Sequence, residues 1–442
     1  MNPKLIRTLL ALAALAVTAL PAYAVSPCAI TTDLDNAGFP RMHIAGTTAK
    51  QITTILVNPT VPKATVSVDC NGDGDTTDVT DLPPADFNQA FYTYDIQMKG
   101  TDTVNFTVVA GTYSGLRLNP QILMGPGTNA LNVFFTGVIL QANSRVSFEI
   151  VGGAGNDTMS LNLPRLNASA FLINADAGAG NDVFTINQLD QVLNSDLEAD
   201  VNLGVGTNTF NYNQSAGAVA SAFAGSNVSV SVDGGSGIDV VNVGLKAIEI
   251  SSKVYFATDL GAGNDKFTAT IDETSFINYG GGGEIHLDAN GGAGTNVLTV
   301  TRNGTTGRPV VALGNLFDVR LKGGSGVDTL NLDINNLFNL GASGFDGIFR
   351  VRMDGGGGND LINFTAVTGA PALATAVHDV VITGGAGTDK LNINYTNTSP
   401  TQNAAATYGP AGKILIDGFT GVDTCVINTN ALTIINKRDC EL

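Results

Sequence analysis

A glycine-rich turn that ends in an acidic or amide residue returns at near-constant intervals along most of the chain. When each turn is indexed by that last residue, successive index residues lie 25 to 34 positions apart. They are Asp102, Asn129, Asp157, Asp182, Asn208, Asp239, Asp265, Asn296, Asp328, Asp360, Asp389 and Asp423. Such an interval is typical of repeat proteins, in which each unit stacks on the one before it.

The residues on both sides of each turn alternate between apolar and small polar side chains. Met159 and Phe184 lie two residues after an index position, and the polar residues Ser160 and Thr185 follow them. Apolar residues also lie seven and nine positions before the index. The alternation indicates one strand on each side of the turn, each with a buried face and a wet face. A variable stretch with a third strand would absorb the differences in repeat length.

One such unit cannot bury its apolar face alone, but units wound on one another can. We therefore predict an all-β fold, a right-handed parallel β-solenoid (β-helix) of about 11–12 coils with N- and C-terminal caps. At about 4.8 Å per coil the rod would be roughly 55 Å long. The alternative is a β-sandwich with glycine-rich hairpins.

Residues 1–24 have the pattern of a secretory signal peptide, with two cations, an apolar run and a small residue at Ala24. Residues 25–95 would form an N-terminal cap, 96–423 the solenoid and 424–442 a C-terminal cap. We expect export to the cell surface or the extracellular space, with the periplasm as the alternative, and no membrane insertion.

Charge and cysteine content bound the partners and the redox compartment. The net charge of −17 would become −19 once Lys4 and Arg7 are removed, which disfavours nucleic acid and favours cations. Four cysteines in an exported chain suggest two disulfides. Of the three pairings, Cys28–Cys70 and Cys425–Cys440 are favoured because each joins residues near one end.

Stacked coils would align the index carboxylates along one edge of the rod. Neighbouring carboxylates about 4.8 Å apart would repel each other by about 3.5 kcal/mol at an effective dielectric of ~20. Further acids lie six residues before an index Asp, just ahead of the turn, at Asp176, Asp233, Asp259, Asp354 and Asp417. Carboxylates beside backbone carbonyls suit a hard cation, and Ca²⁺ better than Mg²⁺. The alternative is a turn in which Asp and Asn only cap backbone N–H groups, and Asn at three positions favours it.

The segments GGAGNDTMS, GGSGIDVVN and GGGGNDLIN resemble the hemolysin-type (RTX-like) nonapeptide G-G-x-G-x-D-x-U-x. The resemblance implies a calcium-binding β-roll and calcium ligation by Asp157, Asp182, Asp239, Asp265, Asp328, Asp360 and Asp389. Three departures weaken it: one motif per repeat in place of tandem motifs, Asn at three index positions, and an N-terminal signal peptide.

A second candidate calcium site lies in the segment DCNGDGD. Asp69, Asn71, Asp73 and Asp75 occupy positions 1, 3, 5 and 7 of an EF-hand-like loop, with a glycine at position 6. Position 12 is Thr80 in place of the usual glutamate. The alternative is an acidic turn without metal.

Residues with catalytic spacing were not found, since His43, His286 and His378 lie far from any nucleophile motif. Arg320 and Arg352 share one position in adjacent repeats, after Asp288, which indicates a surface salt-bridge column. We therefore predict a non-enzymatic, calcium-binding structural or adhesive protein, with cell-surface or matrix polysaccharide or self-association as further partners. The alternatives are a β-helix polysaccharide-active enzyme and a filament-forming surface protein.

Overall fold

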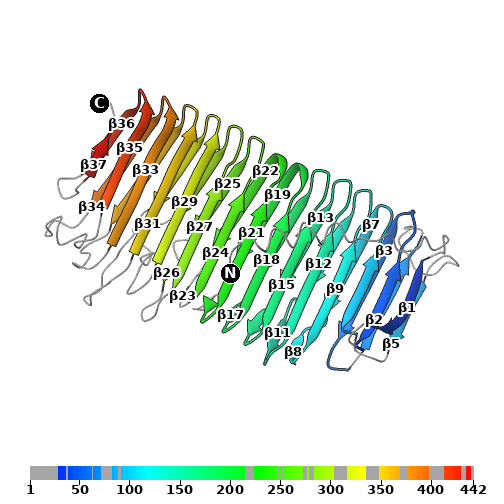
Figure 1. Cartoon of the computed structure of the whole chain (residues 1–442). Coiled ribbons are helices and arrows are strands. Elements are labelled where there is room, and N and C mark those ends of the chain that lie inside the picture. The colour runs from blue at the N-terminus through cyan, green and yellow to red at the C-terminus, as the bar shows by residue number, and fades with distance from the viewer. Residues whose placement is uncertain are drawn as a thin grey trace.

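The chain forms an elongated rod of stacked β-coils (Figure 1). The structure is a computed structural model that describes residues 28–35, 38–61, 63–70, 82–87, 91–214, 223–245, 249–250, 252–271, 276–277, 283–302, 316–334, 348–368, 377–397, 413–429 and 435–439. These residues form 37 strands and no helix. In this part of the chain, accordingly, no helix is long and apolar enough to cross a membrane. The prediction of an all-β, parallel β-solenoid is confirmed.

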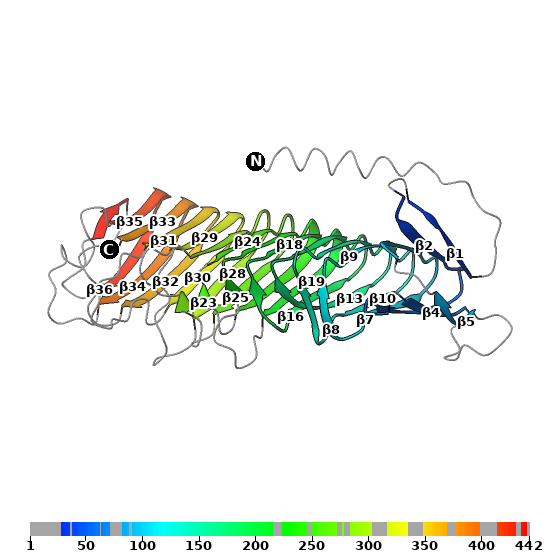
Figure 2. The ribbon, with the colours of Figure 1, turned by 90° about the horizontal axis from the view of Figure 1, so that it is seen from below.

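Two long sheets form the two layers of the rod (Figure 2). Sheet I contains, in spatial order, β1 (Ala29–Leu34), β2 (Pro40–Ala45), β6 (Thr93–Gln97), β9 (Arg117–Leu123), β12 (Arg145–Val151), β15 (Ala170–Asp176), β18 (Asp196–Asn202), β21 (Asn227–Asp233), β24 (Lys253–Asp259), β27 (Glu284–Asn290), β29 (Leu316–Ser325), β31 (Ile348–Gly357), β33 (Val377–Gly387), β35 (Lys413–Gly421) and β37 (Ile435–Arg438). Sheet II contains β36 (Thr424–Thr429), β34 (Lys390–Asn397), β32 (Leu361–Thr368), β30 (Thr329–Ile334), β28 (Val297–Arg302), β25 (Lys266–Ile271), β22 (Ser236–Leu245), β19 (Val205–Gln214), β16 (Val183–Gln188), β13 (Thr158–Leu163), β10 (Ala130–Phe134), β7 (Asp102–Val108), β3 (Gln51–Asn58), β4 (Lys63–Asp69) and β5 (Leu82–Phe87).

A third, shorter sheet lies in the variable stretch of the repeat. Sheet III contains β26 (Phe276–Ile277), β23 (Glu249–Ile250), β20 (Phe223–Ala224), β17 (Val192–Leu193), β14 (Arg165–Asn167), β11 (Val138–Gln141) and β8 (Gly111–Ser114). The predicted third strand is therefore present, with 7 strands among the described residues. Complete three-strand coils in that part of the chain are thus fewer than the 11–12 coils expected.

The alternation of the sequence sets the register of sheet II. Leu131 pairs with Met159, and Met159 with Phe184, each being two residues after its index position. All three side chains are buried. At the outward-facing positions that alternate with these apolar residues, amides of successive strands form ladders. For example, Asn392 Nδ2 on β34 donates to Asn363 Oδ1 on β32 at 2.8 Å. The predicted buried apolar face and wet polar face of these strands are both confirmed.

Aromatic side chains stack inside the rod in the same register. Phe184 and Phe210 lie 6.1 Å apart with ring planes 15° from parallel, and Phe317 and Phe349 lie 5.9 Å apart at 11°. Such pairs contribute roughly 0.5–1.5 kcal/mol each beyond the burial of their area. Identical inward positions in successive coils therefore form a continuous core.

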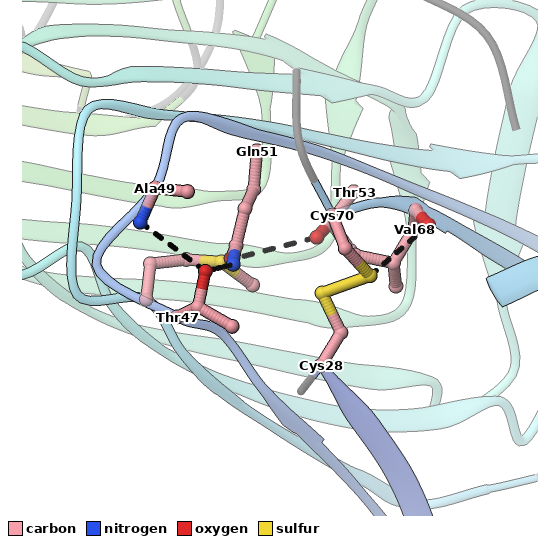
Figure 3. Close-up of a disulfide and its surroundings, with 8 residues drawn as sticks. Cys28, Thr47, Ala49, Gln51, Thr53, Val68 and Cys70 are labelled. Atoms are coloured by element: carbon pink, nitrogen blue, oxygen red, sulfur yellow. Dashed lines mark hydrogen bonds between the residues drawn. A yellow bond between two sulfur atoms is a disulfide. The ribbon is translucent and has the colours of Figure 1, made fainter. Parts of the chain in front are cut away.

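Antiparallel strands close the N-terminal end of both layers. Strand β1 pairs antiparallel with β2 in sheet I, and β3, β4 and β5 form an antiparallel meander in sheet II. The predicted disulfide Cys28–Cys70 joins the residue before β1 to the residue after β4 (Figure 3). It therefore links the two layers where the rod begins. Cys425 is also disulfide-bonded, and its expected partner Cys440 lies outside the described residues.

Candidate metal centre

Glycine is required at the turns because successive coils approach each other through their backbones. Gly155 and Gly180 lie two residues before their index positions and have φ angles of 130° and 154°. A Cβ on Gly180 would overlap the carbonyl oxygen of Gly155 in the preceding coil. The close approach and the positive φ both exclude a side chain, so the glycines follow from stacking.

The index side chains lie at the corner between sheets I and II and point into the rod. All twelve are at most 2% exposed. Asp102, the first of them, accepts the backbone N–H of Gly100 with Oδ2. In each of the other eleven, Oδ1 accepts a hydrogen bond from the backbone N–H of the index residue one coil earlier. The eleven bonds are 2.7–3.3 Å long. The carboxylates are thus aligned along the rod, as expected, and they are buried behind the turns rather than exposed on an edge.

The second oxygen of the index carboxylates has no hydrogen-bond partner among the described residues. This holds for Oδ2 of Asp157, Asp182, Asp239, Asp265, Asp328, Asp360, Asp389 and Asp423. A buried, unpaired carboxylate oxygen is costly, because water no longer solvates it and no donor replaces water. A column of this kind therefore requires a proton or a cation.

The index asparagines show which groups surround that second position. Asn129 Nδ2 donates to Gly125 O at 3.2 Å, to Gly127 O at 3.1 Å and to Asp157 Oδ1 at 2.9 Å. Asn208 Nδ2 donates to Asp239 Oδ1 at 2.9 Å. Since Oδ1 has the same role in Asn and Asp, the Oδ2 atom of each Asp takes the place of this amide nitrogen. It then faces acceptors where a donor is needed.

Burial raises the pKa of the index carboxyls, because loss of water disfavours the charged form. The pKa is raised to about 6 for Asp182 and Asp360 and to about 7 for Asp239. The neighbouring carboxylate of Asp265 raises the pKa of Asp239 further. The direction is the same for Asp157 and the other predicted calcium ligands of the column.

The oxygens around Oδ2 match the donors that a hard cation prefers. A Cβ on Gly234 would lie 2.6 Å from Leu260 O and 2.8 Å from Asp239 Oδ2, so a carbonyl and a carboxylate oxygen face one space left open by glycine. Carboxylates alone do not suffice, since no group of three or more His, Cys, Asp or Glu residues in the described part of the chain could hold a metal. Backbone carbonyls would supply the remaining ligands, as they commonly do for Ca²⁺.

The acids six residues before the index lie outside this column. Asp176, Asp233, Asp259, Asp354 and Asp417 occupy one register position at the end of sheet I strands. Asp233 Oδ1 accepts the backbone N–H of Gly235 at 3.1 Å. These acids add negative potential to the column, and each of Asp176, Asp233 and Asp354 raises the pKa of the index carboxyl that follows it.

The EF-hand-like loop is described only at its first residue. Asp69 is buried at the end of β4, beside the disulfide-bonded Cys70. Asn71, Asp73 and Asp75 lie outside the described residues.

The arginine column forms ion pairs, but with acids that the sequence had not singled out. Arg320 Nη2 lies 3.0 Å from Asp318 Oδ2, and Arg352 Nη2 lies 2.5 Å from Asp379 Oδ2. The register pairs Arg320 with Asp288, yet its hydrogen bond goes to Asp318 on its own strand. Outward alternation along sheet I was the signal that could have found Asp318 and Asp379.

Comparisons with known proteins add no relative: no family model, no curated protein and no solved structure matches the chain.

Proposed function

We propose that this protein is a secreted, calcium-binding structural or adhesive protein of the cell surface or extracellular matrix, in which Ca²⁺ stabilises the stacked turns. One observation carries the proposal. Each index Asp caps a backbone N–H with one buried oxygen, and its other buried oxygen has no donor and faces backbone and carboxylate acceptors. A cation at that position would neutralise carboxylates of successive coils and join the coils to each other.

The index asparagines divide the column into separate acidic segments. Two consecutive carboxylates occur at the steps Asp157–Asp182, Asp239–Asp265, Asp328–Asp360, Asp360–Asp389 and Asp389–Asp423. At the steps Asn129–Asp157 and Asn208–Asp239 the amide donates to Oδ1 of the next carboxylate, so an N–H donor stands where an Asp–Asp step would bring a second negative charge. The proposal therefore assigns calcium to the five Asp–Asp steps. The loop that begins at Asp69 is proposed as a separate site.

A structural role is supported by the construction of the rod. The same buried, hydrogen-bonded positions recur in every coil from β7 to β36. These positions therefore stabilise the contact between neighbouring coils and do not build a single cleft. The net charge of −17 suits an environment rich in divalent cations. The polysaccharide partner expected from the sequence is considered below.

The test is a calorimetric titration of Ca²⁺ into chelator-treated protein, with thermal unfolding measured in parallel. We expect about five ions from the column and one from the loop, and a large rise in the unfolding midpoint. Mg²⁺ is the matched control and should raise the midpoint much less, because it loses water reluctantly. Binding of one ion, abolished by Asp73→Asn, would restrict calcium to the loop and refute the role of the turns.

A further inference from the structure

A group of charged side chains covers the outer face of sheet I between β27 and β33. The group, called here the arginine cluster, consists of His286, Asp318, Arg320, Arg350, Arg352 and Asp379. Three of its members are guanidinium groups on the neighbouring strands β29 and β31. In a chain with a net charge of −17, this concentration of arginine is unexpected.

Two carboxylates, those of Asp318 and Asp379, form ion pairs with the three guanidinium groups. Asp318 is buried, and its Oδ2 lies 3.0 Å from Arg320 Nη2, 3.6 Å from Arg350 Nη1 and 3.4 Å from His286 Nδ1. Asp379 Oδ2 lies 3.6 Å from Arg350 Nε and accepts a hydrogen bond from Arg352 Nη2. Arg352 Nη1 also donates to the backbone oxygen of Asp379 at 2.8 Å. The guanidinium groups are therefore held in place before any ligand arrives.

The register places two of these cations directly beside each other. Arg350 lies between Asp318 and Asp379, so opposite charges alternate along its row. In the neighbouring row, Arg320 lies between Asp288 and Arg352, and Val381 follows Arg352. Like charges directly opposite each other on adjacent strands destabilise a sheet. Asp288, Asp318 and Asp379 offset part of this repulsion, and an anion that accepts from both guanidinium groups would offset the rest.

Both arginines keep donors available for such an anion. The Arg320 side chain is 51% exposed and the Arg352 side chain 34%. A guanidinium has five N–H donors. Within the described part of the chain Arg320 directs its donors to one acceptor, and Arg352 directs its donors to three, which are Val351 O, Asp379 O and Asp379 Oδ2. The planar fork matches the two oxygens of a carboxylate or sulfate group.

We propose that Arg320 and Arg352 bind the carboxylate groups of an acidic polysaccharide that lies along the rod axis. Adjacent strands are about 4.8 Å apart, which is close to the length of one sugar residue in an extended chain. Tyr255 continues the same face, stacked on His286 at 4.2 Å with ring planes 4° apart, and is 39% exposed. The charge of the rest of the chain acts weakly at this site, since salt screens exposed charges beyond about 8 Å.

The inference does not rest on the calcium proposal, because no index residue belongs to the arginine cluster. The experiment measures binding of alginate-derived oligouronates to the full chain at a fixed calcium concentration. Arg320→Gln and Arg352→Gln should each weaken binding at least about tenfold, as expected for loss of a charged hydrogen bond. Arg352→Lys keeps the charge but lacks the planar fork of donors, so its affinity should lie between that of the parent and that of Arg352→Gln.

The chain contains a matched control on the same sheet. Arg117 and Arg145 also pair in register and face outward, but no acid among the described residues forms an ion pair with either. Arg117→Gln and Arg145→Gln, each made singly, remove the same charge as the test substitutions and should leave binding unchanged. Unchanged unfolding midpoints will show that the variants remain folded.

Three outcomes would overturn the proposal. Equal weakening by the control pair would mean that binding depends on net charge alone. Binding of heparin-derived oligosaccharides without binding of oligouronates would assign the site to sulfate esters. Tighter binding of a single-stranded oligonucleotide than of oligouronates would assign it to phosphates.

Discussion

The backbone N–H of Asp157 donates to Oδ1 of Asp182, a residue 25 positions later in the chain, at 2.7 Å. The bond joins one coil to the next through a side chain rather than through the ladder of backbone bonds. Repetition of this bond from Asp102 to Asp423 makes the index residues a second, lateral line of connection along the rod. An amide can make the same bond, so the charge of the aspartates needs a separate explanation.

Asp360→Asn should separate the capping role from the cation role. In chelator we expect a stability gain of about 1–3 kcal/mol, because an amide nitrogen replaces an oxygen that faces acceptors. With calcium present, about two fewer ions should bind, since Asp360 belongs to two of the Asp–Asp steps. Calorimetry and denaturant unfolding measure both.

The control for that substitution is Asp333→Asn, which removes the same charge from the exposed face of β30. It should change neither ion number nor stability appreciably. A loss of stability in Asp360→Asn in the presence of chelator would contradict the conclusion that Oδ2 occupies a position where a hydrogen-bond donor is needed.

Two adjacent glycines in one turn should respond very differently to alanine. At Gly358 the φ angle is 142° and a Cβ would overlap Gly326 O, whereas at Gly357 nothing lies within 4 Å. Gly358→Ala should cost at least about 2 kcal/mol of unfolding free energy. Gly357→Ala should stay within about 0.5 kcal/mol of the parent. Similar unfolding curves for the two variants would show that coil contact does not dictate the glycines.

Stability of the metal-free protein should fall as the pH rises from about 4 to about 7. The folded-state pKa is about 6 for Asp182 and Asp360 and about 7 for Asp239, above the ordinary value of 3.8 for an aspartic acid. Above pH 4 the unfolded chain therefore releases protons that the folded chain keeps, which favours unfolding. Urea unfolding in chelator across this range measures the slope, and Asp239→Asn should reduce it. A rise in stability over the same range would exclude protonated index carboxyls.

Removal of the Cys28–Cys70 disulfide should loosen the start of the rod. The bond spans 42 positions and joins the ends of β1 and β4, so its loss in the double serine variant should cost about 2–4 kcal/mol. Limited proteolysis should then cleave within residues 25–95 before the later coils. Cleavage that begins elsewhere would mean that the disulfide does not secure this end.

The sequence predicted the solenoid because the strand period and the repeat interval agree. The apolar positions represented by Leu131, Met159 and Phe184 pair as the index spacing requires. The strands of sheet III were less visible, because elements as short as Val192–Leu193 carry too few residues for a periodic signal.

The direction of the index side chains could not be read from the turn motif. A turn Asp can point outward to solvent or inward to cap the backbone, and the choice depends on the neighbouring coil. Likewise, the partners of Arg320 and Arg352 depend on which acids cover the same face. Asp318 and Asp379 lie ten residues before their index positions, so outward alternation places them on the same face as the arginines, and the assembled sheet shows which acid pairs with which arginine.

The capping bond has a direction, since a later coil always supplies the oxygen and the earlier coil the N–H. A coil is therefore incomplete until its successor arrives. The antiparallel strands at the N-terminal end form a paired sheet edge on which the first coil can add its strands. For a chain that emerges N-terminus first from a narrow pore, each newly docked coil would lock the previous one, so that folding itself could oppose backward sliding.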